Sequence, residues 1–269
     1  MAEQKTSKTG AHTPDRLDIG PRFSESDAIR LNRLFRGTET QDMLASVIRD
    51  NLVGDLAVVS SFGAESAVLL HMIAEVDPAT PVLFLDTFKH FPETLAYRDE
   101  LVAHLGLTNL IILTPDAEEL AAKDETELRW SYDPDGCCEI RKVKPLAKAL
   151  AGYDASITGR KGFQSETRAG LPRFEIDSSD AQGRLKINPL ANMSAEDIEA
   201  YFEEYALPRH PLVEQGYPSI GCAPCTSKVA PGEDPRSGRW KGWDKTECGI
   251  HSPVGGANDA DDGANDPVF

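Results

Sequence analysis

Short apolar runs separated by longer helical stretches dominate the first part of the chain. Each run has the length of a strand and is apolar almost throughout, which is typical of parallel strands buried on both faces. Turn-forming or helix-initiating residues follow most of them. The runs predicted as strands are Leu56–Ser60, Pro81–Asp86, Asn109–Leu113 and Ala155–Thr158.

Helices are predicted between and around these strands. Ser26 is placed to cap a first helix, and Thr38 with Gln41 has the pattern of a capping box for a second, which ends near Leu52. Ser194 is placed to cap another helix far along the chain. The remaining predicted helices are 65–75, 92–105, 116–123 and one that carries Cys137 and Cys138 and that Pro145 is expected to kink or break.

The alternation of strand and helix predicts an α/β fold, in which a parallel sheet is flanked by helices and joined by right-handed crossovers. Residues 173–177 and 184–188 are expected to add a hairpin at an edge of that sheet. No internal repeat interrupts this order.

The composition limits the classes of function. A net charge of −16 favours a soluble chain and argues against general binding of nucleic acid, although a local basic pocket can still hold a small anion. No run reaches the roughly 18 apolar residues that a membrane helix needs, and the polar first twenty residues do not form a secretory signal. We therefore expect a cytoplasmic protein, in which grouped cysteines indicate metal or redox chemistry more often than disulfides.

Polar residues follow three of the predicted strands directly. They are Ser60-Ser61, Asp86-Thr87 and Gly159-Arg160. Ligands of open parallel sheets bind beyond the carboxyl ends of the strands, so these residues predict a ligand site there. The stretch 60–66 lies between a strand and a helix, where backbone N–H groups can bind an anion, but it is not a Walker A loop because no Gly-Lys-Ser/Thr follows.

The five cysteines divide into four and one. Cys137, Cys138, Cys222 and Cys225 offer four thiolates, enough for one [4Fe–4S] cluster or one tetrahedral zinc ion. The adjacent pair favours the cluster, because two neighbouring ligands strain the coordination of a single small ion more than that of a cube-shaped [4Fe–4S] cluster. Cys248 is left over as a candidate reactive thiol.

Three stretches resemble known families. Residues 60–66 resemble the modified P-loop of the adenine-nucleotide α-hydrolase superfamily, with Ala64 and Glu65 in place of a Gly and an Asp. Residues 85–94 resemble the Leu-Asp-Thr-x-x-x-Phe-Pro-Glu-Thr signature of phosphoadenylyl- and adenylyl-sulfate reductases. Residues 159–168 resemble that family's Gly-x-Arg-x-x-Gln-Ser-x-x-Arg loop, with Lys161 at a position where Arg is more usual.

Further motifs point to one branch of this family. Residues 247–251, Glu-Cys-Gly-Ile-His, resemble its Glu-Cys-Gly-Leu-His element, and residues 236–240 match Arg-x-Gly-Arg-Trp. The adjacent cysteine pair with the Cys-x-x-Cys matches the pattern of cluster-bearing sulfonucleotide reductases. The chain is thus identified as similar to the assimilatory adenylyl-sulfate (APS) reductases of the family.

This resemblance implies thioredoxin-dependent reduction of APS to sulfite and AMP, through an S-sulfocysteine on Cys248. It implies that His251 assists the thiol, that the other four cysteines bind a [4Fe–4S] cluster and that Lys142 lies between cluster and phosphosulfate. The cluster's expected part is structural and electrostatic. The substrate-binding residues predicted from the resemblance and the strand ends are Ser60, Ser61, Phe62, Gly63, Ser66, Leu85, Asp86, Thr87, Lys142, Gly159, Arg160, Arg168, Arg236 and Arg239.

Three alternatives stay open at this point. A phosphoadenylyl-sulfate (PAPS) reductase shares fold and thiol, an ATP pyrophosphatase shares the phosphate loop, and a zinc-binding module explains the four cysteines alone. The expected division is a flexible N-terminal arm at 1–26, a nucleotide-binding α/β domain at 27–220, a cluster-ligand and catalytic segment at 221–251 and a disordered acidic tail at 252–269. Oligomeric state is left open.

Overall fold

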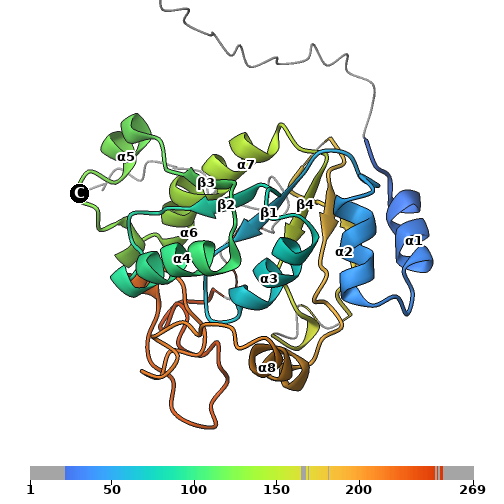
Figure 1. Ribbon diagram of the computed structural model, residues 1–269. Coiled ribbons are helices and arrows are strands. Elements are labelled where there is room, and N and C mark those ends of the chain that lie inside the picture. The colour runs from blue at the N-terminus through green and yellow to red at the C-terminus, as the bar shows by residue number, and fades with distance from the viewer. Residues whose placement is uncertain are drawn as a thin grey trace, which may run out of the picture.

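A six-stranded sheet with the order β3-β2-β1-β4-β6-β5 forms the centre of the structure (Figure 1). This computed structural model describes residues 22–164, 168, 170–180, 182–245, 247 and 249–250. β1 pairs in parallel with β2 and β4, so that Val58 lies opposite both Val82 and Ile157. β5 is antiparallel to β6, and the other pairings in the described sheet are parallel. The strands are β1 (Leu56–Ser60), β2 (Val82–Leu85), β3 (Leu110–Leu113), β4 (Ala155–Thr158), β5 (Phe174–Ile176) and β6 (Leu185–Ile187).

The predicted α/β class with a parallel sheet flanked by helices is confirmed. All the predicted strands are present, and the first and fourth have the predicted bounds. The predicted hairpin exists as β5 and β6, but β6 lies inside the sheet because it also pairs with β4. Only β5 of the two is an edge strand.

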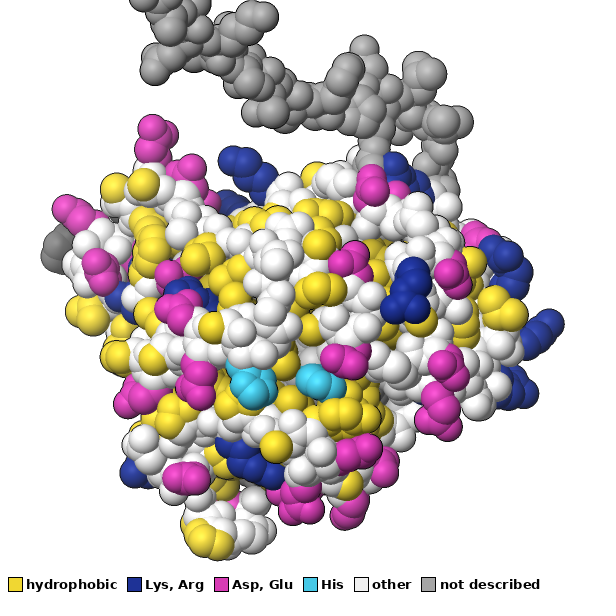
Figure 2. Space-filling model, in the orientation of Figure 1, with side chains coloured by type: hydrophobic (Ala, Val, Ile, Leu, Met, Phe, Trp, Pro, Cys, Tyr) yellow, Lys and Arg dark blue, Asp and Glu magenta, His cyan; other side chains and the backbone are white. Residues whose placement is uncertain are grey.

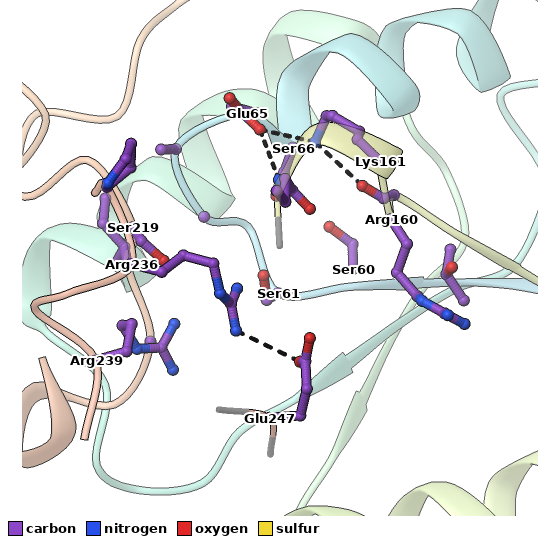
Figure 3. A pocket seen from close by; sticks show the side chains of 18 of the residues that line it. Ser60, Ser61, Glu65, Ser66, Arg160, Lys161, Ser219, Arg236, Arg239 and Glu247 are labelled. Carbon is purple, nitrogen blue, oxygen red and sulfur yellow. Dashed lines mark hydrogen bonds and ion pairs between the residues drawn. The ribbon is translucent and has the colours of Figure 1, made fainter. Parts of the chain in front are cut away.

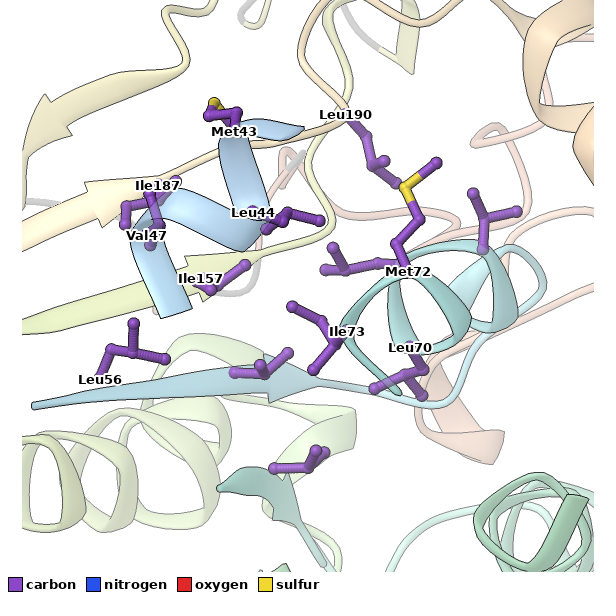
Figure 4. Close-up of a cluster of buried hydrophobic side chains, with 14 of the residues drawn as sticks. Met43, Leu44, Val47, Leu56, Leu70, Met72, Ile73, Ile157, Ile187 and Leu190 are labelled. Carbon is purple, nitrogen blue, oxygen red and sulfur yellow. The ribbon is translucent and has the colours of Figure 1, made fainter. Parts of the chain in front are cut away.

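Both faces of the sheet are covered by apolar side chains, as continuous apolar strands require. On one face, Val58 and Phe84 pack with α2, α3 and α4 in the larger core cluster. Figure 4 shows part of this cluster, with Leu44 of α2, Ile73 of α3 and Ile157 of β4. On the other face, Ala57 and Leu83 pack with Leu146 of α7. Successive strand residues thus point to opposite sides, as the period of two dictates.

The capping residues at the starts of the first two helices differ from those predicted. Ser24, not Ser26, caps α1, because its hydroxyl accepts from the Asp27 N–H and Asp27 bonds back to Ser24 in a capping box. The predicted box at Thr38 is also absent, since Glu39 precedes α2 and makes no side-chain cap. The α-helices are α1 (Glu25–Leu34), α2 (Thr40–Ile48), α3 (Ser66–Val76), α4 (Pro92–Leu105), α5 (Ala117–Lys123), α6 (Pro134–Cys138), α7 (Lys144–Leu150) and α8 (Ala195–Glu204).

A kink or break was predicted at Pro145, and the cysteine-bearing helix does not break there. Helix α6 continues through the π-helical turn Glu139–Val143 into α7, where the Lys144 N–H bonds to the Glu139 carbonyl. Proline has no N–H to bond the carbonyl four residues back, and a wider turn accommodates this loss. This turn carries Arg141 and Lys142.

The C-terminal part packs on the sheet domain as loops, orange to red in Figure 1, with one short 3-10 turn, Ala223–Cys225. An isolated bridge joins Thr226 to Arg239, and the Ala223 N–H bonds to the Lys89 carbonyl. Within the described chain, no helix combines the length and the apolar character that spanning a membrane requires. Acidic side chains outnumber basic ones on the face in Figure 2, in line with the net charge of −16.

Helix α1 begins at Glu25, two residues before the predicted start of the folded domain. The predicted tail and nearly all of the arm lie outside the described residues. The division of the chain therefore stays a prediction.

Candidate functional site

A cavity of about 630 Å³ opens at the carboxyl ends of the strands. The chain passes from β1 through β2 to β3 on one side and returns to place β4 on the other side of β1. Loops diverge at this switch point, which is where open parallel sheets form their ligand crevices. The predicted substrate residues that line the cavity are Ser60, Ser61, Gly63, Ser66, Leu85, Thr87, Lys142, Gly159, Arg160, Arg168, Arg236 and Arg239.

The phosphate loop presents small polar groups to the cavity. Figure 3 shows Ser60 and Ser61 between the arginines of the C-terminal segment and Arg160. Phe62 does not line the cavity; its fully buried ring packs edge-on against Phe84. Phe62 adopts the left-handed conformation with a φ of 48°, which L-residues rarely take. A substrate contact from Phe62 is therefore restricted to its backbone.

The second loop divides its predicted residues between two tasks. Asp86 does not line the cavity, because its carboxylate accepts the Phe88 N–H at 3.0 Å and closes a local turn. Thr87 is fully buried and lines the cavity, and its hydroxyl lies 3.3 Å from the Cys222 sulfur. The loop after β2 therefore connects the cavity to the cysteines.

Basic side chains surround the cavity, and several are paired with carboxylates. Arg160 donates to Glu175 at 2.7 Å. Lys161 is buried and lies 2.8 Å from Glu65; burial lowers its pKa, and the Glu65 charge opposes that shift. The paired carboxylates balance the charge of these partly desolvated cations, which line the cavity.

Arg168, Arg236 and Arg239 complete this basic lining. Arg168 and Arg236 both contact Glu247. The guanidinium of Arg239 stacks on the Trp240 ring, 4.5 Å from its centroid. Guanidinium groups suit oxyanions because their planar forks make paired hydrogen bonds.

The four predicted ligand cysteines line one small second cavity together. Cys137, Cys138 and Cys222 are at most 8% exposed, and Cys225 is half-buried. Burial raises the pKa of Cys137 and of Cys225 to about 11. Among the described residues, no group of three or more His, Cys, Asp or Glu side chains has the spacing of a site for a metal ion.

Lys142 lines both cavities, as do Cys222 and Trp240. Burial alone would raise the pKa of Cys222, but the charge of Lys142 and hydrogen bonds from Thr87 and Lys142 outweigh it, and the pKa is lowered. The structure therefore places Lys142 between the cysteines and the larger cavity. The resemblance implied a place between cluster and phosphosulfate, and that role of Lys142 stays a prediction.

Arg141, which the sequence analysis missed, lies beside the cysteines. It is 2% exposed and donates to the Thr87 carbonyl at 2.9 Å and to Asp124 at 2.6 Å. Its Nε is buried without a hydrogen-bond partner in the described structure. A basic dipeptide soon after the cysteine pair was visible in the sequence, but the pattern did not indicate which of its two residues is buried.

Cys248 and His251, the predicted catalytic residues, lie outside the described residues. Their described neighbours Glu247 and Ile250 both line the larger cavity. Ile250 also packs against the apolar cluster that includes Leu85. The roles of Cys248 and His251 stay predictions.

Comparisons with known proteins agree on one family. The family model described as phosphoadenosine phosphosulfate reductase domain matches residues 55–228. An adenosine 5'-phosphosulfate reductase from Mesorhizobium japonicum is 50% identical over 224 residues, 83% of this chain and 87% of that protein. One from Chelativorans sp. is 54% identical over 200 residues, 74% of this chain and 80% of that protein.

Two further relatives carry the other name within the family. A phosphoadenosine 5'-phosphosulfate reductase from Gloeobacter violaceus is 42% identical over 82% of this chain and 92% of that protein. The crystal structure of a phosphoadenylyl-sulfate reductase from Candida auris, in a phosphate complex, is similar with a TM-score of 0.65 at 30% identity. That match covers 77% of this chain and 98% of the other.

Proposed function

The chain belongs to the phosphoadenosine phosphosulfate reductase family, an oxidoreductase family that acts on a sulfur group, and on that premise we propose that it reduces APS to sulfite and AMP in sulfate assimilation. The observation that carries the proposal is the basic cavity at the β1/β4 switch point, which shares Lys142 and Cys222 with the cysteine cavity. The choice of APS is supported by the relatives at 50% and 54% identity, which bear that substrate's name.

In the proposed complex, the AMP part of APS occupies the cavity, and its phosphate lies at the loop of Ser60 and Ser61. Hydroxyls and backbone N–H groups at a strand–helix turn suit that anion. The sulfate end then extends toward Lys142, Arg236 and Arg239, which line the same cavity from the cysteine side. Cations at this end stabilise the charge that develops as the sulfur–oxygen bond breaks.

The chemistry begins with the Cys248 thiolate, which attacks the sulfur of APS. A sulfur–sulfur bond forms, the bond from sulfur to the phosphate oxygen breaks and AMP leaves with that electron pair. A thiolate of thioredoxin then attacks the Cys248 sulfur and displaces sulfite, leaving a mixed disulfide that the second thioredoxin thiol resolves. Thioredoxin thus loses two electrons as it becomes a disulfide, and the sulfur gains them. We assign the reaction to the cytoplasm, where dithiols stay reduced.

A [4Fe–4S] cluster on Cys137, Cys138, Cys222 and Cys225 is the second part of the proposal. Its support is the donor set: four thiols line one cavity, and the buried Arg141 beside them has an Nε without a hydrogen-bond partner in the described structure. A tetrahedral zinc ion needs sulfurs roughly 3.8 Å apart, whereas a cube binds each thiolate on a different iron and tolerates wider spacing. When bound, the cluster would supply a fixed negative charge and a covalent link between α6 and the C-terminal loops. The positive charge of Lys142 would balance the cluster's charge on the side that faces the substrate.

The test is sulfite release with thioredoxin, measured for APS and for PAPS with the wild type and Cys248→Ser. We expect turnover of APS, at least tenfold preference over PAPS in kcat/KM and no sulfite from the variant. A preference for PAPS would overturn the substrate, and the same activity in Cys248→Ser would overturn the mechanism. AMP binding that persists in the variant would show that its loss of activity is not a loss of the fold.

A further inference from the structure

A hydrogen-bonded network of polar side chains crosses strands β4, β6 and β5 next to the larger cavity. Thr158 ends β4 and lines the cavity, and Asn188 directly follows β6. The register pairs Ile157 with Ile187, so that the next residues along the two strands, Thr158 and Asn188, come side by side. The Thr158 hydroxyl donates to Oδ1 of Asn188 at 2.7 Å. The pairing of the strands therefore sets the first contact of the network.

Asn188 is fully buried, and both parts of its amide group are bonded. Its Nδ2 donates to the Pro172 carbonyl and to Oε1 of Glu175, each at 3.0 Å. Both of these partners are acceptors, so the amide nitrogen must lie on their side and the orientation of the amide group is determined. A rotation of the buried amide would leave polar atoms without partners, which is costly. Asn188 is therefore a fixed point behind the cavity.

Glu175 extends this network from Asn188 to Arg160. It lies on the edge strand β5, and its Oε1 accepts both the Asn188 Nδ2 and, at 2.7 Å, the Arg160 Nη1. The Arg160 side chain is 15% exposed and that of Glu175 27%. Arg160 lines the cavity, whereas Glu175 and Asn188 do not. The position of the carboxylate is thus set from behind, and the carboxylate sets the position of the guanidinium.

The charge of Glu175 by itself does not favour an anion in the cavity. A carboxylate beside Arg160 offsets part of the attraction that the guanidinium exerts on an anion. If charge were all that mattered, removal of this carboxylate would strengthen the binding of an anion. A fixed guanidinium acts the other way, because less side-chain freedom is lost on binding and its planar fork stays aligned. Charge balance and orientation therefore predict changes of opposite sign.

We propose that Glu175 and Asn188 are positioning residues that hold Arg160 for the phosphate of the AMP part of APS. Ser60 and Ser61 lie between Arg160 and the arginines of the C-terminal segment (Figure 3), so a phosphate at the two serines has cations on both sides. Arg160 keeps Nη1 on Glu175 and offers its remaining N–H groups to the phosphate. The inference rests on the proposed function, since it takes the AMP part of APS to occupy this cavity.

The experiment compares Glu175→Gln, Asn188→Ala and Arg160→Gln with the wild type by calorimetry. Each protein is titrated with AMP and with adenosine, which lacks the phosphate, in the absence of APS and thioredoxin. Urea denaturation of the same proteins measures the free energy of unfolding. The double variant Arg160→Gln/Glu175→Gln tests whether Glu175 acts through Arg160.

Glu199→Gln is the matched control. Glu199 lies on α8 and accepts two hydrogen bonds from Arg209, and both side chains are at least 40% exposed. Neither residue lines the cavity. The control therefore removes the charge of a paired glutamate without a route to the nucleotide, and it should match the wild type with both ligands.

Arg160→Gln should bind AMP about 10- to 100-fold more weakly, the range of one charge-assisted hydrogen bond. Glu175→Gln and Asn188→Ala should bind AMP about three- to tenfold more weakly, because the guanidinium is still present but no longer held. Affinity for adenosine should change by less than about twofold in these three variants, since adenosine has no phosphate for Arg160 to contact. The double variant should bind AMP as weakly as Arg160→Gln alone.

Three results would overturn the proposal. Unchanged or tighter binding of AMP to Glu175→Gln and Asn188→Ala would reduce Glu175 to charge balance. A further loss in the double variant would show that Glu175 does not act through Arg160. Equal losses for adenosine and AMP would indicate a general change in the sheet.

The test does not depend on a single variant or on the reaction. If Asn188→Ala does not fold, Glu175→Gln and the double variant decide the question, because neither changes a fully buried residue. Failure of the proposed function is distinguishable as well. The wild type would then release no sulfite from APS, while the affinities for AMP and adenosine would still report on the network.

Discussion

At the scale of single residues, His210 shows how burial fixes a protonation state. His210 is fully buried; its Nδ1 accepts the Leu212 N–H at 3.2 Å, and its Nε2 lies 3.0 Å from the Thr94 hydroxyl. Burial lowers the pKa of His210 to about 4, and the charge of Glu93 opposes the shift only in part. A proton on Nδ1 would abolish its role as acceptor, so the folded state needs the neutral ring.

The folded protein should therefore lose stability in mild acid. Between pH 6.5 and about 4 the unfolded chain binds a proton at His210 and the folded chain does not, so this contribution is complete above pH 6.5 and is lost as the pH falls. The shift corresponds to about 3 kcal/mol. His210→Asn retains an acceptor for the Leu212 N–H and should reduce the fall in unfolding free energy from pH 7 to pH 4.5, measured by urea denaturation. An equal fall in variant and wild type would contradict this assignment.

Individual residue types were predictable where chemistry demands them, but their partners were not. The motif indicated Arg168 as a cavity residue, and it does line the cavity. Its pairing with Glu247 depends on a segment 79 residues away, which no local pattern encodes. Asp86 and Phe62 were predicted to bind substrate, but neither side chain lines the cavity: the Asp86 carboxylate accepts the Phe88 N–H, and the Phe62 ring packs against Phe84.

At the scale of elements, Gly221 lets the C-terminal loop approach Arg239. A Cβ at this position would lie 2.2 Å from Nη2 of Arg239 and 2.5 Å from its Cζ. Gly221→Ala should thus move the guanidinium out of its place over Trp240 while leaving the backbone unstrained. In a Cys248→Ser background, we expect Gly221→Ala to bind APS roughly tenfold more weakly, about the value of one charge-assisted hydrogen bond. The free energy of unfolding should change by less than about 1 kcal/mol.

Gly152→Ala is the control for that substitution. The Cβ would meet only the Ala149 carbonyl oxygen, at 4.0 Å, and the site lies beyond the end of α7, away from the cavity lining. Its APS affinity should equal that of the background protein. Equal affinity in Gly221→Ala as well would remove Arg239 from the substrate site.

The prediction of elements was better than the prediction of their ends. Apolar strands are recognised by composition alone, and Leu56–Ser60 was predicted to the residue. The start of α1 was not, because Ser24 and Ser26 are equally good caps in isolation and the Asp27 side chain selects Ser24. The π-turn before Pro145 follows from a missing N–H, but the sequence alone did not distinguish a wider turn from a kink.

At the scale of the whole molecule, the four cysteines that line the smaller cavity come from parts of the chain that are far apart in sequence. Cys137 and Cys138 end α6, whereas Cys222 and Cys225 belong to the C-terminal loops. The proposed cluster, bound to all four, would close a loop of roughly 80 residues, and the chain-entropy model gives about 4.5 kcal/mol for such a cross-link. Removing it should lower the thermal midpoint by about 10 °C.

Cys138→Ser should therefore be colourless and less stable, whereas Cys248→Ser should remain brown and as stable as the wild type. Anaerobic purification, iron and sulfide analysis and thermal unfolding measure these outcomes. About four irons and four sulfides per chain are expected in the wild type. One zinc ion per colourless chain would contradict the cluster.

The sequence by itself determined the layered architecture, the edge of the sheet at which the cavity lies and many of the residue types that line it. Continuous apolar runs require burial on both faces, and the polar residues that end them gather at one edge of a parallel sheet. Only the tertiary structure decided that Lys142 stands between two cavities, that Arg141 is buried on Asp124 and that Glu247 holds Arg168. The physical reason is range: periodicity and capping act within a few residues, whereas the partner of a charged side chain is set by the packing of segments far apart in the chain.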